Sequence, residues 1–373
     1  MIFSKHIFSF TFLFLIWSCS QPYTDYEIDS DLDKLTTYDS GKIADIVQFS
    51  SLELGYIDSQ KDIKLFNTQE SAILEPFLNN SDMDLNEIVL ATRSDGVQAL
   101  FTIDRYNNIW ARRYDDAITD GWMGDPINCS NSEMVHGDSK YPVRFTINDE
   151  LTDIFILFDH PESSSTSLYD DSYILGKRTL YRGSLLFDED DGIFENQGCT
   201  LLSETSYIVG ADTTFLSFSK DASNIYYSNN QLYVINPTNN EVVTIVSPSE
   251  NPSLGTSISV EKPEQIVFNN NKIYIARDGY GGVEVVSNTG ISIDSFAAGF
   301  TVNDIFIDEA SNYIALSCGY HGVLIYSIDS ENKYHEKLAI ATSFAYSSVL
   351  TDDILYVATK NGIEKIDLTE ELK

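Results

Sequence analysis

The sequence predicts an all-β protein, a β-propeller in which repeated antiparallel units are arranged in a ring. A Gly-Tyr-x-Gly-Val turn occurs twice, at residues 279–283 and 319–323, and each copy joins two apolar segments. Segments with helical periodicity are nearly absent, and Asn, Asp, Gly and Ser gather between short apolar segments. Repetition of this kind is typical of β-units that bury their faces only against one another.

The spacing of the turns predicts the number of units. Shorter copies of the pattern occupy residues 355–366 and 89–100, so that Ala91 and Ala358 hold equivalent positions 267 residues apart. Six equal steps over this distance are about 44 residues long, which is the length of a four-stranded propeller blade. We therefore expect seven blades, with six or eight as alternatives. No unit is visible near residue 135, so the middle third is expected to carry insertions.

Apolar segments between the turns define the expected strands. Residues 266–268, 304–307 and 348–350 alternate at period two or run apolar, which suits inner strands that are buried on both faces. Residues 43–67 contain two segments of similar character. We expect this region to supply strands that close the ring against the C-terminal unit, because closure removes exposed sheet edges.

The N-terminus predicts export. Lys5 and His6 precede an apolar run over residues 7–17 that ends at Ser18. The run is shorter than the roughly 20 residues that span a bilayer, and it fits the hydrophobic region of a secretory signal. We therefore expect a cleaved signal peptide over residues 1–18.

Two segments follow the signal. Residues 19–40 are polar and acidic without apolar periodicity, so we expect an acidic flexible tether there. Residues 41–373 are expected to form a single propeller domain. Hydrophobic residues make up 43% of the chain, which is ample for a large core and excludes a disordered acidic protein.

Cys19 directly follows the signal, and this junction resembles the lipobox of bacterial lipoproteins, in which the cysteine becomes lipid-modified. The resemblance rests on Ser18 and Cys19 at the end of the apolar run, whereas the bulky Trp17 departs from the usual pattern. It implies a lipid anchor in the bacterial cell envelope. Ser20, in place of Asp, resembles lipoproteins sent onward to an outer membrane, where the protein would face the periplasm or the exterior.

The repeat resembles the LVIVP-type repeats of bacterial surface and periplasmic β-propellers. The shared pattern is a strand with Tyr-Ile-Ala or Tyr-Val-Ala, a Gly-rich turn, and a second strand that begins Gly-Val or Gly-Ile. It covers residues 264–368, with one isolated unit over residues 86–104. The resemblance implies a propeller outside the cytoplasm, and it implies no particular activity because a fold hosts many functions.

The net charge indicates which partners to expect, and the cysteine positions indicate a possible disulfide. With 57 acidic residues against 23 Lys and Arg, the formal charge is −34, which excludes nucleic acid as a partner and leaves the lipid anchor as the expected membrane contact. Cys129 and Cys199 lie in polar contexts and could pair in an exported protein. Cys318 occupies a repeat position and is expected to be a small buried thiol.

The turns suggest a binding face, since equivalent turns of successive blades emerge at one end of a propeller. No HExxH, Gly-x-Ser-x-Gly or Walker A sequence occurs, so chemistry on a known catalytic motif is not expected. Cations, amides and aromatic rings on one face could hold a carbohydrate, a peptide or a small anion. The candidate residues are Arg93, Ser94, Asp95, Arg277, Asp278, Tyr280, Tyr320, His321, Lys360 and Asn361. The alternative is that they are solvated turn residues, with Tyr280 and Tyr320 packed between blades.

An acidic loop is the candidate metal site. Asp188, Asp190 and Asp191 precede Gly192, and hard oxygen ligands in a Gly-terminated loop suit calcium. The register departs from that of an EF-hand by one residue, so a charged insert loop is the alternative. Calcium is the one cofactor for which the sequence gives any indication.

The function expected from the sequence is that of an extracytoplasmic, lipid-anchored binding or interaction module. It would recognise a protein or glycan of the cell envelope through one propeller face. A structural subunit of an envelope complex is one alternative, and a propeller-type lyase or hydrolase is another. The sequence favours binding over catalysis. An axial pair of carboxylates with a basic partner would favour the enzyme.

Overall fold

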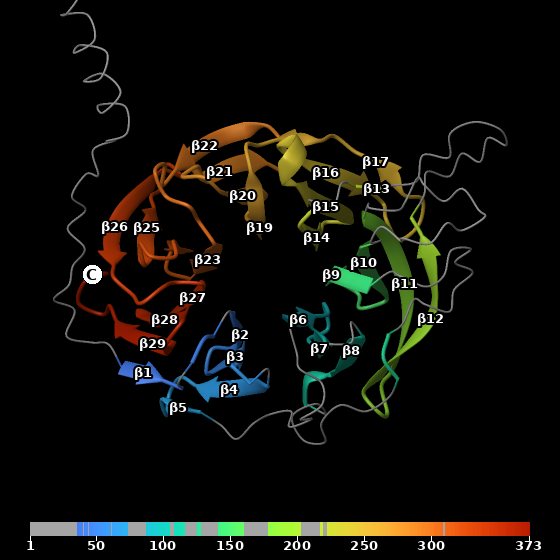
Figure 1. Ribbon diagram of the computed structural model, residues 1–373, viewed down its shortest axis with the longest axis horizontal. Helices are drawn as coiled ribbons and strands as arrows, with labels where there is room; N and C mark the ends of the chain where they lie inside the picture. The colour runs from blue at the N-terminus through green and yellow to red at the C-terminus, as the bar shows by residue number, and fades with distance from the viewer. Residues whose placement is uncertain are drawn as a thin grey trace, which may run out of the picture.

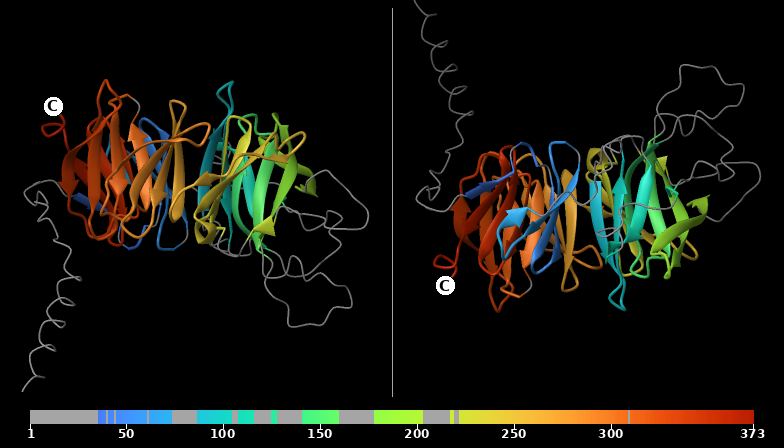
Figure 2. Two further views of the ribbon diagram at one scale, coloured as in Figure 1. Left: turned by 90° about the horizontal axis from the view of Figure 1, so that it is seen from above. Right: turned by 90° about the horizontal axis from the view of Figure 1, so that it is seen from below.

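The structure, a computed structural model, describes residues 36–39, 41–43, 45–60, 62–73, 87–104, 108–115, 125–127, 141–159, 178–202, 217–218, 222–308 and 310–373. Antiparallel sheets in this part of the chain are arranged radially around a common axis (Figure 1). In side view the strands run across the thickness of a flat disc, and the turns emerge at its two ends (Figure 2). The signal segment and Cys19 lie outside the described residues.

The first four blades are built from the N-terminal half of the chain. Blade 1 contains β2 (Ile46–Ser50), β3 (Glu53–Ile57), β4 (Ile63–Asn67) and β5 (Ala72–Ile73). Blade 2 contains β6 (Glu87–Thr92), β7 (Gln98–Ile103) and β8 (Ile109–Arg113). Blade 3 contains β9 (Tyr141–Ile147), β10 (Asp153–Asp159), β11 (Arg178–Asp188) and β12 (Ile193–Leu201), and β13 (Ser217–Phe218) pairs with β11. Blade 4 contains β14 (Asn224–Ser228), β15 (Gln231–Asn236), the 3₁₀ helix η1 (Pro237–Asn239), β16 (Glu241–Val246), β17 (Ser253–Leu254) and β18 (Ile258–Ser259).

The last three blades follow without interruption. Blade 5 contains β19 (Pro263–Asn269), β20 (Lys272–Arg277), β21 (Gly282–Ser287) and β22 (Ser292–Phe296). Blade 6 contains β23 (Asp304–Asp308), β24 (Tyr313–Ser317), β25 (Val323–Ile328) and β26 (Tyr334–Ile340). Blade 7 contains β27 (Ser347–Thr351), β28 (Ile354–Thr359) and β29 (Gly362–Asp367), with β1 (Thr36–Tyr38) as its outer strand.

The described strands make seven blades, which is the expected number. The spacing argument behind that expectation is wrong, because Ala91 lies on β6, an inner strand, whereas Ala358 lies on β28, the second strand of its blade. Six sheets are present, because blades 2 and 3 merge into one sheet of eight strands. Their link is narrow: Ile193 of β12 pairs with Arg112 of β8. Apolar side chains also fill the space between these two blades, with Phe101 and Phe194 in contact at 5.4 Å between ring centroids.

The N-terminal strand β1 closes the ring. Thr36 pairs with Lys365 of β29 and Tyr38 pairs with Ile363, so blade 7 combines both ends of the folded chain (Figure 1). Residues 43–67 form blade 1, which packs against blade 7 in one apolar cluster, so they border the C-terminal unit as expected. The strand that pairs with β29 is β1 and not one of theirs. The closing strand comes from the segment expected as tether, residues 19–40.

Three equivalent glycines explain the repeated turn. Gly282, Gly322 and Gly362 each open the third strand of a blade with a positive φ of 69°, 74° and 131°. A Cβ atom would lie 2.4 Å, 1.9 Å and 2.0 Å from a backbone carbonyl oxygen at the end of the neighbouring outer strand, that of Phe296, Ile340 and Asp39 respectively. Only glycine fits, because the outer strand lies against the backbone itself.

The core lies between blades, as expected for units that cannot bury their faces alone. Tyr274 of blade 5 packs with Ile314 of blade 6, and Ala315 of blade 6 packs with Leu355 of blade 7. The thiol of Cys318 is buried there, as predicted, and burial raises its pKa to about 12. Cys199 is disulfide-bonded. Its predicted partner Cys129 lies outside the described residues.

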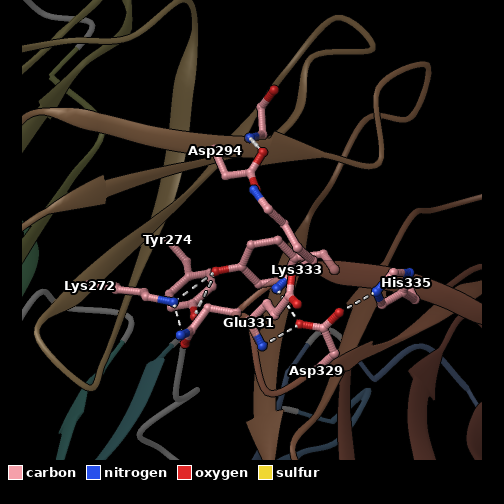
Figure 3. A network of polar contacts seen from close by, with 10 residues as sticks. Lys272, Tyr274, Asp294, Asp329, Glu331, Lys333 and His335 are labelled. Carbon is pink, nitrogen blue, oxygen red and sulfur yellow. Dashed lines mark hydrogen bonds and ion pairs between the residues drawn. The ribbon is translucent and has the colours of Figure 1, made fainter.

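A polar network also joins blades 5 and 6 (Figure 3). Lys333 of the β25–β26 turn forms an ion pair with Asp294 of β22 at 3.0 Å. Lys272 of β20 donates a hydrogen bond to Asn332 in the same turn at 3.0 Å. Asp329 orients the turn by accepting the backbone N–H of Lys333 at 2.9 Å. These contacts join side chains of two neighbouring blades, so we assign the network to blade packing.

Within the part of the chain that the structure describes, no helix has the length and apolar character that a membrane span requires.

Candidate functional site

Second turns of the blades emerge at one end of the ring, which we call the turn face. These are the β20–β21, β24–β25 and β28–β29 turns. The turns contact the segments that lead into inner strands: Asp278 N–H donates to Lys262 O at 2.9 Å, and Gly319 and Ala345 exchange backbone hydrogen bonds at 3.1 and 2.9 Å. Inner strands therefore begin at the turn face, because strands alternate in direction within each blade.

An aromatic cluster with two lysines lies on the turn face. Tyr320, in the β24–β25 turn, is 77% exposed, and its ring meets the edge of Phe344 at 4.6 Å between centroids. Phe344 contacts Tyr346 at 4.5 Å. Lys360 Nζ lies 5.7 Å from the Tyr320 ring, and Lys42 Nζ lies 4.8 Å from the Tyr346 ring. Residues from four connections thus combine aromatic rings with positive charge.

The other predicted residues of the turn face have more local roles. Arg277 pairs with Glu284 at 3.3 Å and donates to Gly281 O, so its charge is already balanced. His321 packs edge-on against Phe300 at 5.5 Å. Tyr280 is 60% exposed at a φ of +69°. Asp278 and Asn361 are exposed in their turns.

Arg93 and Asp95 lie at the opposite end of the ring, so the expectation that they share the face with the other residues is wrong. The segment 89–100 forms the β6–β7 hairpin, which is the first hairpin of its blade, whereas the other copies form the second hairpin. Arg93 makes a bidentate ion pair with Asp95 at 2.9 and 2.8 Å and reaches Glu189 at 3.3 Å. Arg93 therefore links blades 2 and 3.

The acidic loop predicted to bind calcium is the β11–β12 turn. Asp188 accepts the backbone N–H groups of Asp190 and Asp191 at 2.9 and 3.3 Å. This bonding explains the turn without a metal ion. Among the described residues, no group of three or more His, Cys, Asp or Glu side chains could hold a metal ion. Calcium at this loop stays a prediction.

A second candidate site, the axial cluster, was not predicted from the sequence. Each blade contributes a polar side chain at or near the start of its inner strand, and these strands surround the ring axis (Figure 1). The cluster consists of Asp45, Glu87, Arg144, Tyr226, Gln265, Asp304, Ser347 and Ser348. Because inner strands begin at the turn face, the cluster lies toward that end of the ring.

Hydrogen bonds hold two of the axial carboxyl groups in place. Asp304 accepts from Gln265 Nε2 at 2.5 Å and from the Ser348 N–H at 3.1 Å. Gln265 is itself fixed, since its Oε1 accepts the Ile305 N–H at 2.9 Å. Asp45 is bonded by the hydroxyl of Ser347. Side chains from different blades thus hold each carboxyl group, and the ring geometry sets their positions.

Burial strongly affects the charges in the cluster. Burial, together with repulsion from Asp304, raises the pKa of Asp45 to about 6. Burial, opposed in part by the positive charge of Arg144, raises the pKa of Glu87 to about 7. The pKa of Asp304 is also raised by burial. Each of these three residues retains some accessible surface, and Arg144 is exposed. These groups can therefore meet a ligand while being largely shielded from water.

Two further groups of the cluster have unused hydrogen-bonding capacity. The Oε2 atom of Glu87 is buried and has no hydrogen-bond partner among the described residues. The Tyr226 oxygen accepts from Asn224 Nδ2 at 2.8 Å and from the Ile266 N–H. Its hydroxyl hydrogen is therefore free to be donated. Buried polar groups are usually satisfied, so such exceptions indicate a site.

Comparisons with known proteins show the fold. No protein-family profile matches the sequence, and no curated protein sequence matches it. The crystal structure of the computationally designed protein Ika8 is similar, with a TM-score of 0.52 at 10% identity over 90% of this chain and 98% of that chain. The structure of U3-55K is similar with a TM-score of 0.54, at the same identity and coverage. The protein is a β-propeller.

Proposed function

We propose that the protein is an extracytoplasmic, lipid-anchored binding module that recognises a protein or glycan through its turn face. The observation that carries this proposal is Tyr320, which is 77% exposed yet held by Phe344 and overlain by Lys360. An exposed ring fixed in orientation loses little conformational freedom when a partner covers it. Tyrosines of this kind dominate binding energy at protein interfaces.

Charge favours a ligand that carries an anionic group. The chain has a formal charge of −34, yet Lys42 and Lys360 both flank the exposed rings. A local positive region on an acidic surface steers anionic groups toward itself and repels them elsewhere. An acidic protein segment or a glycan with uronic acids would satisfy both the rings and the lysines.

The setting of the module is part of the proposal. Cys19 would hold the propeller at a bacterial envelope membrane, with residues between the anchor and β1 serving as a tether. Thr36 is the first residue of β1, the strand that closes the ring, so the proposed tether would join the propeller there. A tether that enters at blade 7 would leave the turn face available to partners. Processing of the chain at Cys19 and labelling with a fatty-acid analogue would test the anchor.

The turn face is tested by mutation with a matched control at the other end of the ring. The mature protein is screened by thermal shift against acidic and neutral glycans and against acidic peptides, since a ligand of the native state raises the melting temperature. The ligand that gives a shift is then tested on Tyr320→Ala, Lys360→Ala and Asp352→Asn, which lies in the β27–β28 turn. Loss with the first two and retention with the third supports the proposal. Equal retention in all three would contradict it.

The axial cluster favours a second candidate, a propeller-type lyase or hydrolase. Asp45 and Glu87 have pKa values raised toward neutrality beside the basic Arg144. Carboxyl groups with such values can exchange protons at physiological pH. A panel of glycosides, lactones and uronic-acid polymers would reveal activity, and Glu87→Gln should abolish it. Activity that survives in Glu87→Gln would remove this candidate.

A further inference from the structure

The axial cluster contains more negative charge than its own residues balance. Asp45, Glu87 and Asp304 come from three different blades, and among the described residues Arg144 supplies the positive charge that acts on the first two. Asp45 and Asp304 repel each other. Three carboxyl groups against one guanidinium leave a net negative site. Within the described part of the chain no further cation is shown to act on these groups, so a bound cation or added protons would offset the charge.

The free lone pairs of the cluster require a donor. Asp45 and Asp304 already accept bonds from Ser347, Gln265 and the backbone, which orients them but leaves further lone pairs. Glu87 Oε2 accepts no hydrogen bond from any described residue. A protonated primary amine carries three N–H donors and one positive charge. It therefore complements the cluster in charge and in hydrogen bonding.

We propose that the axial cluster binds the primary ammonium group of a small organic amine that approaches along the ring axis from the turn face. This site is distinct from the aromatic cluster and does not depend on the function proposed for it. The carboxyl group of Glu87 is the principal acceptor. Asp45 and Asp304 surround the ammonium group with negative charge, and Arg144 limits how tightly a cation is held.

Other ligand classes fit the cluster less well. No three carboxyl groups among the described residues have the spacing that a metal ion needs, whereas hydrogen bonds to an ammonium group are longer than metal–oxygen bonds and tolerate wider spacing. An anion would meet Arg144 but would be repelled by three carboxyl groups. A neutral alcohol would leave the negative charge unbalanced. An amine is therefore the favoured class.

Binding of an amine is expected to depend on pH. Ionised carboxyl groups are required, and Glu87 and Asp45 have pKa values raised to about 7 and about 6 by burial. An alkylamine stays protonated up to about pH 10. Burial raises the pKa of the Tyr226 hydroxyl, which lies near Glu87 and Asp304, so this group stays neutral over this range. The guanidinium of Arg144 acts on Glu87 and Asp45 as a positive charge. Affinity should thus be highest near pH 8.5 and should fall as the pH is lowered through 7 and 6.

The probe is n-butylamine, with n-butanol as its neutral counterpart, titrated into the full mature protein by ligand-observed NMR or calorimetry. At pH 8.5 we expect saturable binding of n-butylamine and none of n-butanol, with affinity at least about tenfold lower at pH 5.5. Absence of saturable n-butylamine binding at pH 8.5, or equal binding of n-butanol, would overturn the proposal.

Variants locate the site. Glu87→Gln and Asp304→Asn should each weaken n-butylamine binding by about tenfold, while Asp352→Asn removes a carboxyl group at the far end of the ring and should change nothing. Arg144→Gln should strengthen binding several-fold, because it removes the competing cation. This last variant keeps the test decisive if the others fail to fold. Unchanged affinity in Arg144→Gln and in the folded carboxyl variants would place the amine elsewhere and reject the site.

Discussion

The backbone N–H of Ile46 donates a 2.9 Å hydrogen bond to the Oγ atom of Ser347, although 301 residues separate them in the sequence. The same Ser347 hydroxyl is hydrogen-bonded to the carboxyl group of Asp45. One side chain of blade 7 thus fixes the first residue of the blade 1 inner strand and orients an axial acid. The same side chain therefore joins blade 7 to blade 1 and helps to position the axial cluster.

Ser347→Ala is expected to lower the free energy of unfolding by about 1–3 kcal/mol, because it leaves the buried Ile46 N–H without its partner. It should also raise the pKa of Asp45 further, since the Ser347 hydroxyl lowers it. Urea denaturation measures the first effect. Ser343→Ala is the control: the Ser343 hydroxyl is buried without a hydrogen-bond partner among the described residues, so its removal should cost nothing. Equal losses in both variants would contradict this assignment.

Glu87→Gln is expected to change how stability depends on pH. The pKa of Glu87 is raised from 4.5 to about 7 in the folded protein, so the fold binds this proton more tightly than the unfolded chain does. The wild-type protein should therefore lose stability as the pH rises from about 4.5 to 7, and the variant should not. Above pH 7.5 the variant should be more stable by roughly 2 kcal/mol, and at pH 4 the two should coincide. Parallel curves at all pH values would show that Glu87 is ionised freely.

Gly322→Ala is expected to destabilise the protein by more than about 2 kcal/mol. The new Cβ atom would lie 1.9 Å from the Ile340 carbonyl oxygen, so β25 or β26 must shift. Gly96→Ala separates this effect from backbone strain, since Gly96 also has a positive φ of 94° but has no atom within 4 Å of the added Cβ. Its cost should be about 1 kcal/mol. Similar melting temperatures for the two variants would show that the outer strand yields easily.

The propeller could be predicted because steric demands repeat with the blades. At Gly282, Gly322 and Gly362 a backbone carbonyl oxygen leaves no room for a Cβ atom, so a glycine recurs at this turn in three blades. Gly96 was misassigned for a physical reason as well: a Gly-Val pair after an apolar strand suits any hairpin of a blade. The sequence pattern therefore does not distinguish the hairpin of the first and second strands from the hairpin of the second and third strands. That distinction places Arg93 at one end of the ring or the other.

The axial cluster could not be predicted from spacing, because each blade supplies one or two of its members. Its residues extend from Asp45 to Ser348, and no two of them from different blades are near in sequence. A weaker signal was nevertheless present. Gln265, Asp304 and Ser348 are polar residues within the first three positions of inner strands, directly before apolar residues. Solvent exposure alone gives no reason for polar residues there. A polar residue near the start of a buried inner strand, repeated around a ring, indicates an axial site.

Removal of β1 is expected to open the ring. A mature protein that begins at Asp39 lacks the pairs of Thr36, Thr37 and Tyr38 with β29, and it exposes the edge of β29 to solvent. We expect a melting temperature lower by several degrees than that of a protein beginning at Thr36, together with concentration-dependent association through the free edge. Light scattering measures the association. A monomer of unchanged stability would show that blade 7 closes without its outer strand.

The pairing of Thr36 with Lys365 has a consequence for how the chain acquires its structure. The partner strand β29 follows the strands of every other blade in the chain, so β1 stays unpaired until all of those strands have been synthesised. Contacts this distant in sequence form slowly. A chain cut short anywhere before β29 would have blades but no ring. The ring can therefore close only in a chain that extends through β29.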